Sequence, residues 1–242
     1  MEKNLSERER LLEALHRRYS KTPGWHDRFL YWRKKYAWLL VVKTSRFLKR
    51  LLDVFVSGVC LILLAPVMLL IALLIKCDGG PIIYVTQRVG KWGKEFSFPK
   101  FRTMQVGAEQ QKNHLKAQST HPGDVTFKMK LDPRITFIGR FLRKSSLDEL
   151  PQLWCVLKGD MSLVGPRPPL VEEVAKYTLA QRRRLDIAPG LTCIWQVSGR
   201  SELPFAQQVE LDVAYIESQS LWLDIKLLLK TIPAILSGKG AY

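Results

Sequence analysis

The longest run of hydrophobic residues in the chain covers positions 54–75 and contains no charged residue. As a helix that rises about 1.5 Å per residue, it is long enough to cross a hydrocarbon layer of about 30 Å. Pro66 divides the run into arms of 12 and 9 residues, each reaching only about half of that distance. The length therefore favours a simple span, whereas the proline favours a hairpin that bends near its middle.

Basic residues flank this run on both sides. The stretch 43–50 carries four of them, and Lys76, Arg88, Lys91, Lys94, Lys100 and Arg102 follow the run. Because basic loops are retained in the cytoplasm, a crossing would place one flank on the wrong side of the membrane. A hairpin that enters and leaves by the same face satisfies both flanks, although the residues alone leave the span and the hairpin open.

Three further stretches are amphipathic or apolar. Residues 5–19 predict an amphipathic helix with a capping box of Ser6 and Glu9. Residues 25–42 interleave aromatic and basic side chains, which is typical of a membrane-interface anchor. Packing of these aromatics on the rest of the protein or on a second subunit is the alternative. The apolar stretch 220–236, with Lys226 and Lys230 four residues apart, predicts another helix at the lipid surface.

The pattern after residue 80 changes first to strands and then to helices. Residues 81–90 and 94–104 read as two strands, and the turn Gly-Lys-Trp-Gly between them predicts a hairpin. From residue 132 the spacing is mainly helical, with Leu147, Leu150 and Trp154 on one helix face. Residues 159–170 read as a loop, followed by helices near 170–185 and 204–219. The predicted class is α+β, mainly helical and membrane-associated.

Charge and cysteine content narrow the function. The chain has a formal net charge of +16, which implies an anionic partner such as nucleic acid, acidic lipid or a phosphorylated substrate. Its four cysteines are far apart and form no Cys-x-x-Cys pair, so neither a zinc site nor a disulfide framework is predicted. This usage indicates a reducing environment.

Two adjacent carboxylates, Asp148 and Glu149, stand out in this basic chain. The structural explanation is helix capping, because Ser146 and Glu149 fit a capping box. Several cations lie nearby in the sequence, however, namely Arg134, Arg140, Arg143, Lys158 and Arg167. Arg167 lies between two prolines, which stiffen its loop and suit a planar guanidinium for phosphate binding. Since neighbours on a helix point about 100° apart, the acids are expected to act separately, one attacking and one holding a hard cation.

Several ordered motifs resemble the bacterial sugar transferases, the monotopic phosphoglycosyl transferases. They are PKFRTM (99–104), the segment from Asp132 to Pro168, PGLTCIWQVSGR (189–200) and LWLDIKLLLKT (221–231). The resemblance covers residues 46–242, predicted to be a catalytic domain, and leaves residues 1–45 as a basic, aromatic N-terminal extension. It implies a re-entrant membrane helix over about residues 51–76, bent at Pro66, with both ends in the cytoplasm.

The resemblance also implies a reaction and a set of site residues. The reaction is transfer of a sugar 1-phosphate from a UDP-sugar to polyprenyl phosphate, releasing UMP, as the priming step of polysaccharide or glycoconjugate synthesis. Asp148 corresponds to a nucleophile that forms a phosphosugar-aspartyl intermediate, and Glu149 to the residue that coordinates Mg²⁺. The residues implied for phosphate binding are Lys100, Arg102, Arg143, Arg167 and Arg200, and Asp224 is a further candidate.

These expectations place the catalytic domain on the cytoplasmic face of the bacterial inner membrane, among its lipids and without a nucleic-acid partner. Homo-oligomer formation is left open. The alternative is a membrane-anchored basic module that binds acidic lipid or nucleic acid. No zinc spacing or aromatic RNA-binding motif favours it. Replacing Asp148 with alanine separates the two, because only the enzyme loses its activity.

Overall fold

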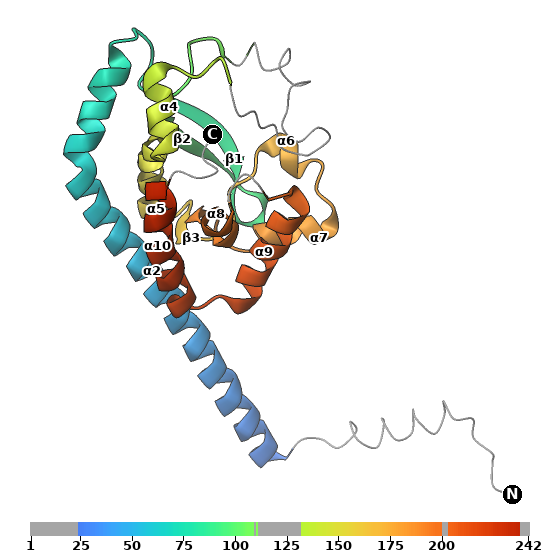
Figure 1. Cartoon of the computed structure of the whole chain (residues 1–242). Helices are drawn as coiled ribbons and strands as arrows, with labels where there is room; N and C mark the ends of the chain where they lie inside the picture. Colours follow the sequence, from blue (N-terminus) through green and yellow to red (C-terminus); the bar gives the residue numbers. More distant parts are fainter. Residues whose placement is uncertain (1–23, 109, 111–131, 200–202, 238–242) are drawn as a thin grey trace, which may run out of the picture. The chain divides into compact units, whose positions relative to one another are not determined.

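The computed structural model describes residues 24–108, 110, 132–199 and 203–237 (Figure 1). The predicted helix over residues 5–19 and the candidate Arg200 lie outside the described residues. The chain divides into two compact units, Met1–Phe47 and Leu48–Tyr242. Helix α2 (Trp25–Lys76) begins in the first unit and ends in the second.

In the first unit, the described residues form the start of α2, and its aromatic side chains are exposed. They are Trp25, Phe29, Tyr31, Trp32, Tyr36 and Trp38. The rings of Trp32 and Tyr36 stack with centroids 5.6 Å apart, and Lys35 Nζ lies 4.8 Å from the centroid of the Trp32 ring. The interfacial anchor predicted here stays a prediction.

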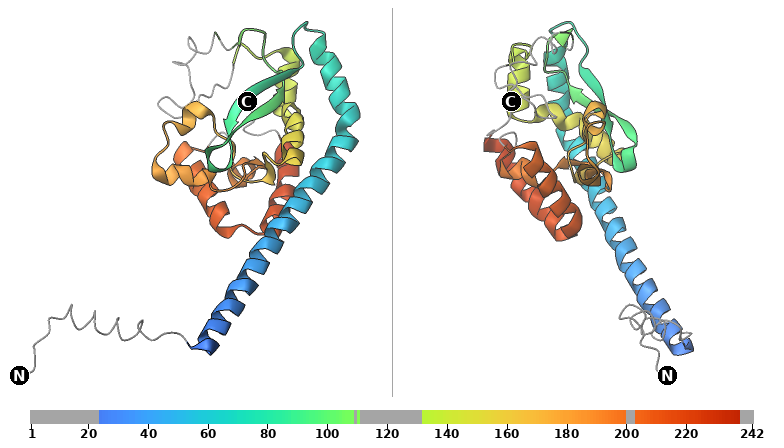
Figure 2. Two further views of the ribbon diagram at one scale, coloured as in Figure 1. Left: turned by 180° about the vertical axis from the view of Figure 1, so that it is seen from behind. Right: turned by 90° about the vertical axis from the view of Figure 1, so that its right-hand side faces the viewer.

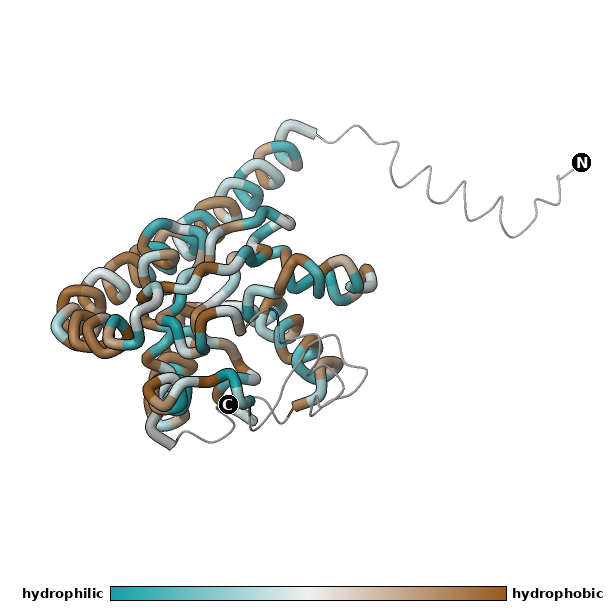
Figure 3. Tube along the Cα trace, turned by 90° about the horizontal axis from the view of Figure 1, so that it is seen from above, coloured by the Kyte–Doolittle hydropathy of each residue, from teal (hydrophilic) through white to brown (hydrophobic). Residues whose placement is uncertain are grey.

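In the second unit, α2 carries the long apolar run. Pro66 lies inside the helix, and the described residues on both sides of it are helical. Among the residues that the structure describes, α2 alone is long and apolar enough to cross a membrane. Its exposed side chains include Phe55, Ile62 and Leu63. In Figure 3, the turns of α2 that are far from the grey N-terminal trace are mostly brown, the colour of hydrophobic residues. The apolar helix is thus present, while its re-entrant course stays a prediction.

The predicted β-hairpin is confirmed. Strands β1 (Ile83–Val89) and β2 (Glu95–Phe101) pair antiparallel, from Ile83 opposite Phe101 to Val89 opposite Glu95. The turn contains the 3-10 segment η1 (Lys91–Gly93), in which Trp92 and Gly93 have positive φ angles of 58° and 82°. Successive side chains of a strand point to opposite faces, so Phe96 and Phe98 of β2 are buried on one face and Phe101 on the other, each face in a different hydrophobic cluster.

Short helices and a second, parallel sheet follow. Beyond the hairpin the order is α4 (Phe137–Lys144), η3 (Leu147–Gln152), α5 (Leu153–Lys158), β3 (Ser162–Val164), α6 (Val171–Val174), α7 (Leu179–Arg182), η4 (Arg183–Leu185), β4 (Gly190–Thr192), α8 (Ile194–Ser198), α9 (Phe205–Ser218) and α10 (Leu221–Ser237). Strands β3 and β4 pair in parallel, with Ser162 opposite Gly190. The α+β, mainly helical class is confirmed, but β3 contradicts the predicted loop over residues 159–170.

One hydrophobic cluster joins Tyr177, Phe205 and Val209, and two others include side chains of α2. The larger one joins Phe98, Val156, Leu163, Tyr215 and Leu227, among others. The smaller one packs Ile71 and Ile75 of α2 against Phe101 and Leu142. From Leu48 onward, α2 lies alongside α4, α5 and α10 (Figures 1 and 2).

The helix face predicted from Leu147, Leu150 and Trp154 is wrong in one member. Leu147 and Leu150 pack against the smaller cluster, but Trp154 is 60% exposed. The chain changes from a 3-10 to an α-helix between them, so the three positions do not keep α-helical phase.

Candidate active site

The acidic pair lies on η3, a 3-10 turn in which Asp148 is buried and Glu149 is partly buried. Ser146, which precedes the turn, adopts the left-handed conformation with φ 56° and ψ 17°, and its side chain makes no capping hydrogen bond. The predicted capping box of Ser146 and Glu149 is therefore wrong, because a capping residue needs an extended backbone. The Glu149 carboxylate instead accepts a hydrogen bond from Lys100.

Lys100 of β2 connects the two carboxylates. Its Nζ lies 2.6 Å from Oε1 of Glu149 and 3.6 Å from Oδ2 of Asp148. The Lys100 ammonium also lies 5.6 Å from the centroid of the Phe98 ring, which precedes it by two positions on the strand. Strand β2 packs on η3, so the strand carries this cation to the acids. The sequence prediction included Lys100 but not this bridging position.

Asp148 faces Lys100 and Arg143. Burial raises the pKa of the Asp148 carboxyl, the charge of Lys100 opposes this rise, the charge of Glu149 adds to it, and the charge of Arg143 again opposes it. Arg143, on the last turn of α4, is oriented by a hydrogen bond from its Nε to Oγ1 of Thr103, 2.9 Å long. Asp148 is thus a buried acid that lies 3.6 Å from Lys100 Nζ and is influenced by the charge of Arg143.

Glu149 faces a different set of cations. Burial alone would raise its pKa, but the charge of Lys100 and then that of Arg167 lower the pKa of Glu149 to about 2, with Arg88 contributing. The two neighbouring acids therefore have opposite pKa shifts. This division is characteristic of sites in which two carboxylates perform different tasks.

Arg167 belongs to a loop that is fixed by close backbone contacts. Gly190 N donates to the carbonyl of Pro166 over 2.9 Å, and Gly165 N donates to the carbonyl of Thr192 over 3.0 Å. A Cβ atom added at Gly190 would lie 2.0 Å from Gly165 N, so only glycine allows this approach. The parallel sheet thereby holds the base of the loop that carries Arg167.

Arg102 forms no hydrogen bond or ion pair with Asp148 or Glu149 among the described residues. Its Nη2 donates to the carbonyl of Ile75 over 3.1 Å, and it pairs with Asp78 at 3.8 Å. These contacts fasten the C-terminal end of α2, where helix carbonyls lack partners within the helix. The charges of Lys100, Arg143 and Arg167 act on the acidic pair, whereas Arg102 binds Ile75 and Asp78.

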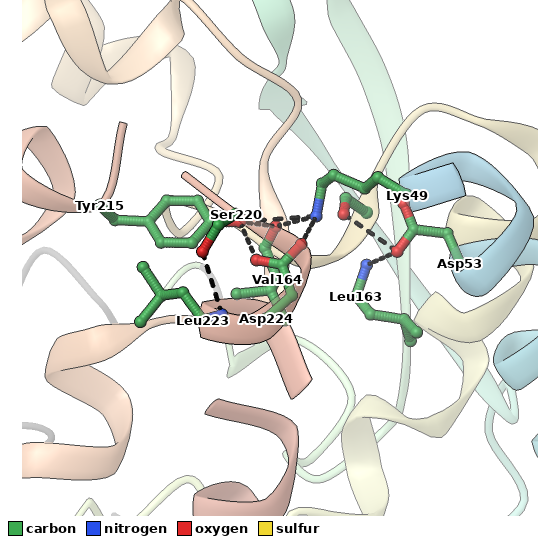
Figure 4. A network of polar contacts seen from close by, with 9 residues as sticks. Lys49, Asp53, Leu163, Val164, Tyr215, Ser220, Leu223 and Asp224 are labelled. Atoms are coloured by element: carbon green, nitrogen blue, oxygen red, sulfur yellow. Dashed lines mark hydrogen bonds and ion pairs between the residues drawn. The ribbon is translucent and has the colours of Figure 1, made fainter. Parts of the chain in front are cut away.

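Asp224 belongs to a separate polar network, shown in Figure 4. It is 1% exposed and pairs with Lys49 Nζ at 2.6 Å while accepting a hydrogen bond from the Tyr215 hydroxyl. One helical turn beyond Lys49, Asp53 accepts hydrogen bonds from Ser162 Oγ and Leu163 N, at 3.1 and 3.0 Å. Arg50 donates to the carbonyls of Val156 and Leu157. The network thus fastens the start of the apolar part of α2 to β3, α5 and α10.

Sequence reasoning missed one residue of this region as a site candidate. Arg88 of β1 influences the pKa of Glu149, and its Nη1 donates to the carbonyl of Pro168, next to Arg167, over 3.0 Å. Arg88 was counted only as a flanking charge, because about sixty residues of sequence separate it from the acids. The sequence signal that could have indicated Arg88 was its place on β1, because the predicted hairpin sets β1 beside the strand that contains Lys100.

The donor set agrees with a magnesium ion only in part. No group of three or more metal-ligating side chains of the His, Cys, Asp or Glu type is found within the described residues. Mg²⁺ commonly binds through one or two carboxylates together with substrate phosphates. Glu149, ionised but surrounded by cations, fits a Mg²⁺ site that substrate phosphates complete.

The sequence of the chain is similar to those of known proteins. The family model described as "Bacterial sugar transferase" matches residues 44–238. Similar relatives are "Galactosyl transferase CpsE" of Streptococcus agalactiae, 48% identical over 80% of this chain and 43% of its own length, and "Undecaprenyl-phosphate galactose phosphotransferase" of Salmonella typhimurium, 45% identical over 84% and 43%. A third is "UDP-glucose:undecaprenyl-phosphate glucose-1-phosphate transferase" of Caulobacter vibrioides, 39% identical over 80% and 72%.

The chain spans less than half the length of the streptococcal and Salmonella relatives. The shared part is the whole region from the apolar helix to α10, which includes the acidic pair and the loop of Arg167. The chain therefore belongs to the bacterial sugar transferase family.

Proposed function

We propose that the protein transfers a sugar 1-phosphate from a UDP-sugar to polyprenyl phosphate through a covalent intermediate on Asp148. The names of the Salmonella and Caulobacter relatives, which specify undecaprenyl phosphate, support the substrate class. The observation that carries the proposal is the buried Asp148 carboxylate, 3.6 Å from Lys100 and under the charge of Arg143, next to an acid of opposite pKa shift.

In the first step, an Asp148 carboxylate oxygen attacks the phosphorus that bears the sugar. A new bond forms between this oxygen and phosphorus, and the bond between that phosphorus and the bridging oxygen of the diphosphate breaks. The electron pair leaves with UMP, which departs as an anion. An ionised aspartate needs no base for this attack, but the attack needs nearby cations, because an anion approaches an anion.

In the second step, a phosphate oxygen of polyprenyl phosphate attacks the same phosphorus. The bond to Asp148 breaks, the carboxylate is restored, and polyprenyl-diphosphate sugar is released. Lys100, Arg143 and Arg167 stabilise the negative charge that develops in both steps. Glu149 would hold Mg²⁺ together with the substrate phosphates, and the bound ion would supply further neutralisation of phosphate charge.

The re-entrant course of α2 belongs to the same proposal. At the start of the apolar run, Lys49 and Asp53 bind α10 and β3. At its end, Ile71 and Ile75 pack on Leu142, and Arg102 binds the carbonyl of Ile75. Both ends therefore contact the same folded unit. A crossing helix would force this charged unit to straddle the bilayer, whereas a helix that enters and returns leaves the unit on the cytoplasmic face.

Exposed apolar side chains on other helices support the same membrane position. They are Phe137 and Phe141 on α4, Trp154 on α5, and Trp222, Leu229 and Ile232 on α10. Lysines 226 and 230 accompany the apolar residues of α10. Aromatic and basic side chains of this kind suit the lipid headgroup region. We place the protein at the inner membrane, where polyprenyl phosphate is available for a priming reaction.

The reaction is tested by incubating the protein in nanodiscs with undecaprenyl phosphate, Mg²⁺ and individual UDP-sugars, and measuring UMP release. The proposal expects UMP and lipid-linked sugar in equal amounts with at least one UDP-sugar, and parallel lines in two-substrate kinetics. Intersecting lines would contradict the covalent route. Lipid binding that survives Asp148→Ala, with no UMP from the unaltered protein, would favour the basic binding module.

The membrane course is tested by cysteine labelling in intact cells. Lys43→Cys and Lys94→Cys introduce single thiols before and after the apolar run, in a chain whose exposed Cys77 and partly buried Cys60 are replaced by alanine. The proposal expects an impermeant reagent to label neither thiol until the inner membrane is opened. Labelling of one of the two positions from outside would show a simple span.

A further inference from the structure

Arg88 is held at the edge of the candidate site by two contacts of its own side chain and one of the neighbouring backbone. Its Nη1 donates to the carbonyl of Pro168, and its guanidinium lies 5.2 Å from the centroid of the buried Phe98 ring. The adjacent backbone is fixed as well, because Val89 N donates to the carbonyl of Pro169 over 3.0 Å. Strand β1 therefore positions Arg88 against the proline-rich loop of Arg167.

This arrangement sets two like charges side by side. Burial and the charge of Arg167 lower the pKa of Arg88 to about 10, so the guanidinium is still charged at neutral pH. Neither arginine forms an ion pair within the described part of the chain. The two acids whose charges act on Arg88 are Glu173 and then Glu149, and they hydrogen-bond other partners, the backbone N of Leu170 and the Lys100 ammonium. Two neighbouring guanidiniums without an ion pair of their own favour an anion that binds between them.

An unpaired hydrogen-bond donor and the net charge of the site also indicate that an anion binds here. The Nε atom of Arg88 is buried and has no hydrogen-bond partner in the described structure. A buried donor without an acceptor destabilises a protein, and a ligand that supplies the acceptor removes this cost. The charges of Lys100, Arg88, Arg143 and Arg167 act on Asp148 and Glu149, and Glu173 also acts on Arg88. Four cations and three acids leave an excess of one positive charge when all three acids are ionised.

We infer that Arg88 is a second phosphate-binding arginine, which with Arg167 holds the diphosphate of the nucleotide sugar on the Glu149 side of the site. The inference rests on the proposed function and adds to it a residue from a different element. The planar guanidinium offers several donors in fixed directions, which matches phosphate oxygens better than a lysine does.

The test measures UDP binding to the full chain in detergent micelles by calorimetry. Arg88→Gln is expected to weaken UDP binding at least tenfold, and Arg88→Lys, which keeps the charge but loses the planar donors, by less. Arg182→Gln, the same substitution at an exposed arginine with no recorded partner among the described residues, is the matched control and should change the dissociation constant less than twofold.

Uridine has no phosphate, so its binding distinguishes phosphate binding by Arg88 from a structural role of Arg88 in holding the loop of Arg167. Its binding, followed by saturation-transfer NMR, is expected to be unchanged by Arg88→Gln. A dissociation constant for UDP within twofold of the unaltered protein would overturn the inference. Equal losses for UDP and uridine, with a lower unfolding temperature, would also overturn it and assign Arg88 a structural role. If the unaltered protein bound no UDP, the proposed function itself would fall, and the inference with it.

Discussion

At the scale of residues, the central feature is that one lysine serves two acids of different character. Lys100 hydrogen-bonds Glu149 and lies 3.6 Å from Asp148. The contact with Glu149 is shorter, and two arginines add to it, so Glu149 ionises easily. Asp148 has less compensation for its burial, and its pKa rises. The surroundings alone thus give the two neighbouring acids opposite pKa shifts, as the proposed roles of nucleophile and charged partner require.

Replacing Lys100 tests this electrostatic assignment. Asp148 must be ionised to attack, so the rate of the first step falls as the pH drops through its raised pKa. Lys100 lowers that pKa, and Lys100→Met is therefore expected to move the acid limb of the single-turnover rate to higher pH. Rapid-quench measurements across a pH series check this, with Lys94→Met as the exposed control. An acid limb that stays in place or moves to lower pH would contradict the assignment.

The charges around Glu149 predict how Mg²⁺ and nucleotide depend on each other. Because three cations surround this carboxylate, Mg²⁺ should bind well only together with phosphate. UDP binding is expected to weaken about tenfold when EDTA replaces Mg²⁺, and this dependence should largely vanish in Glu149→Gln. Calorimetric titrations measure both, with the exposed Glu172→Gln as control. An equal effect of Mg²⁺ on all three proteins would remove Glu149 from the proposed metal site.

At the scale of elements, polar contacts at both ends of the apolar run fasten α2 to the catalytic unit. Among these contacts, the pair of Lys49 and Asp224 has the most deeply buried carboxylate. Removing one partner of a buried pair leaves an uncompensated charge, whereas replacing both removes the desolvation cost as well. The pair therefore matters for the integrity of the unit, and Asp224 has no contact with the acidic pair within the described structure.

Lys49→Met is accordingly expected to lower the free energy of unfolding by about 3–5 kcal/mol. The double variant Lys49→Met/Asp224→Leu should lose less than the single one. Arg183→Met breaks an exposed pair with Glu217 and should cost at most about 1 kcal/mol. Denaturant unfolding in micelles provides the comparison. A double variant less stable than Lys49→Met would show that the carboxylate of Asp224 is needed for more than this pair.

The close approach of β3 and β4 makes a second prediction about elements. Gly190→Ala forces a Cβ against Gly165 N, which displaces the loop of Arg167 and should cost about 1–3 kcal/mol through overpacking. Gly58→Ala meets no atom within 4 Å and lies inside α2, so it should be neutral or stabilising by about 0.5–1 kcal/mol. Unfolding temperatures and UDP affinity of the two variants test this, and equal behaviour would refute the role of the glycine contact.

At the scale of the whole molecule, local patterns predicted the elements better than the contacts between them. Alternation and turn residues were sufficient for the β1–β2 hairpin, and the apolar run was sufficient for α2. The parallel pairing of β3 and β4 was not predictable, because each strand has only three residues and their pairing depends on glycines far apart in the sequence. The left-handed backbone of Ser146, just before the 3-10 turn, likewise overrode a local capping signal.

For the candidate site as well, sequence motifs predicted the residue types better than the contacts that these residues make. Motif resemblance identified Asp148, Glu149 and most of the surrounding cations. It did not separate Arg102, which fastens the end of α2, from Lys100, only two residues earlier in the same motif. Nor did it include Arg88, which reaches the site through strand pairing and the contact with Pro168. Those distinctions depend on which side chain the folded chain directs toward the acids.

The covalent role of Asp148 is tested most directly by mixing the protein with a UDP-sugar labelled in its sugar and its β-phosphate, without polyprenyl phosphate, and quenching in acid. The account predicts one labelled phosphosugar per active protein, attached at Asp148, released together with one UMP and lost when polyprenyl phosphate is added. Asp148→Asn should acquire no label, whereas Asp160→Asn should be labelled normally. UMP that appears only after polyprenyl phosphate is supplied, with no label on the protein at any time, would contradict it.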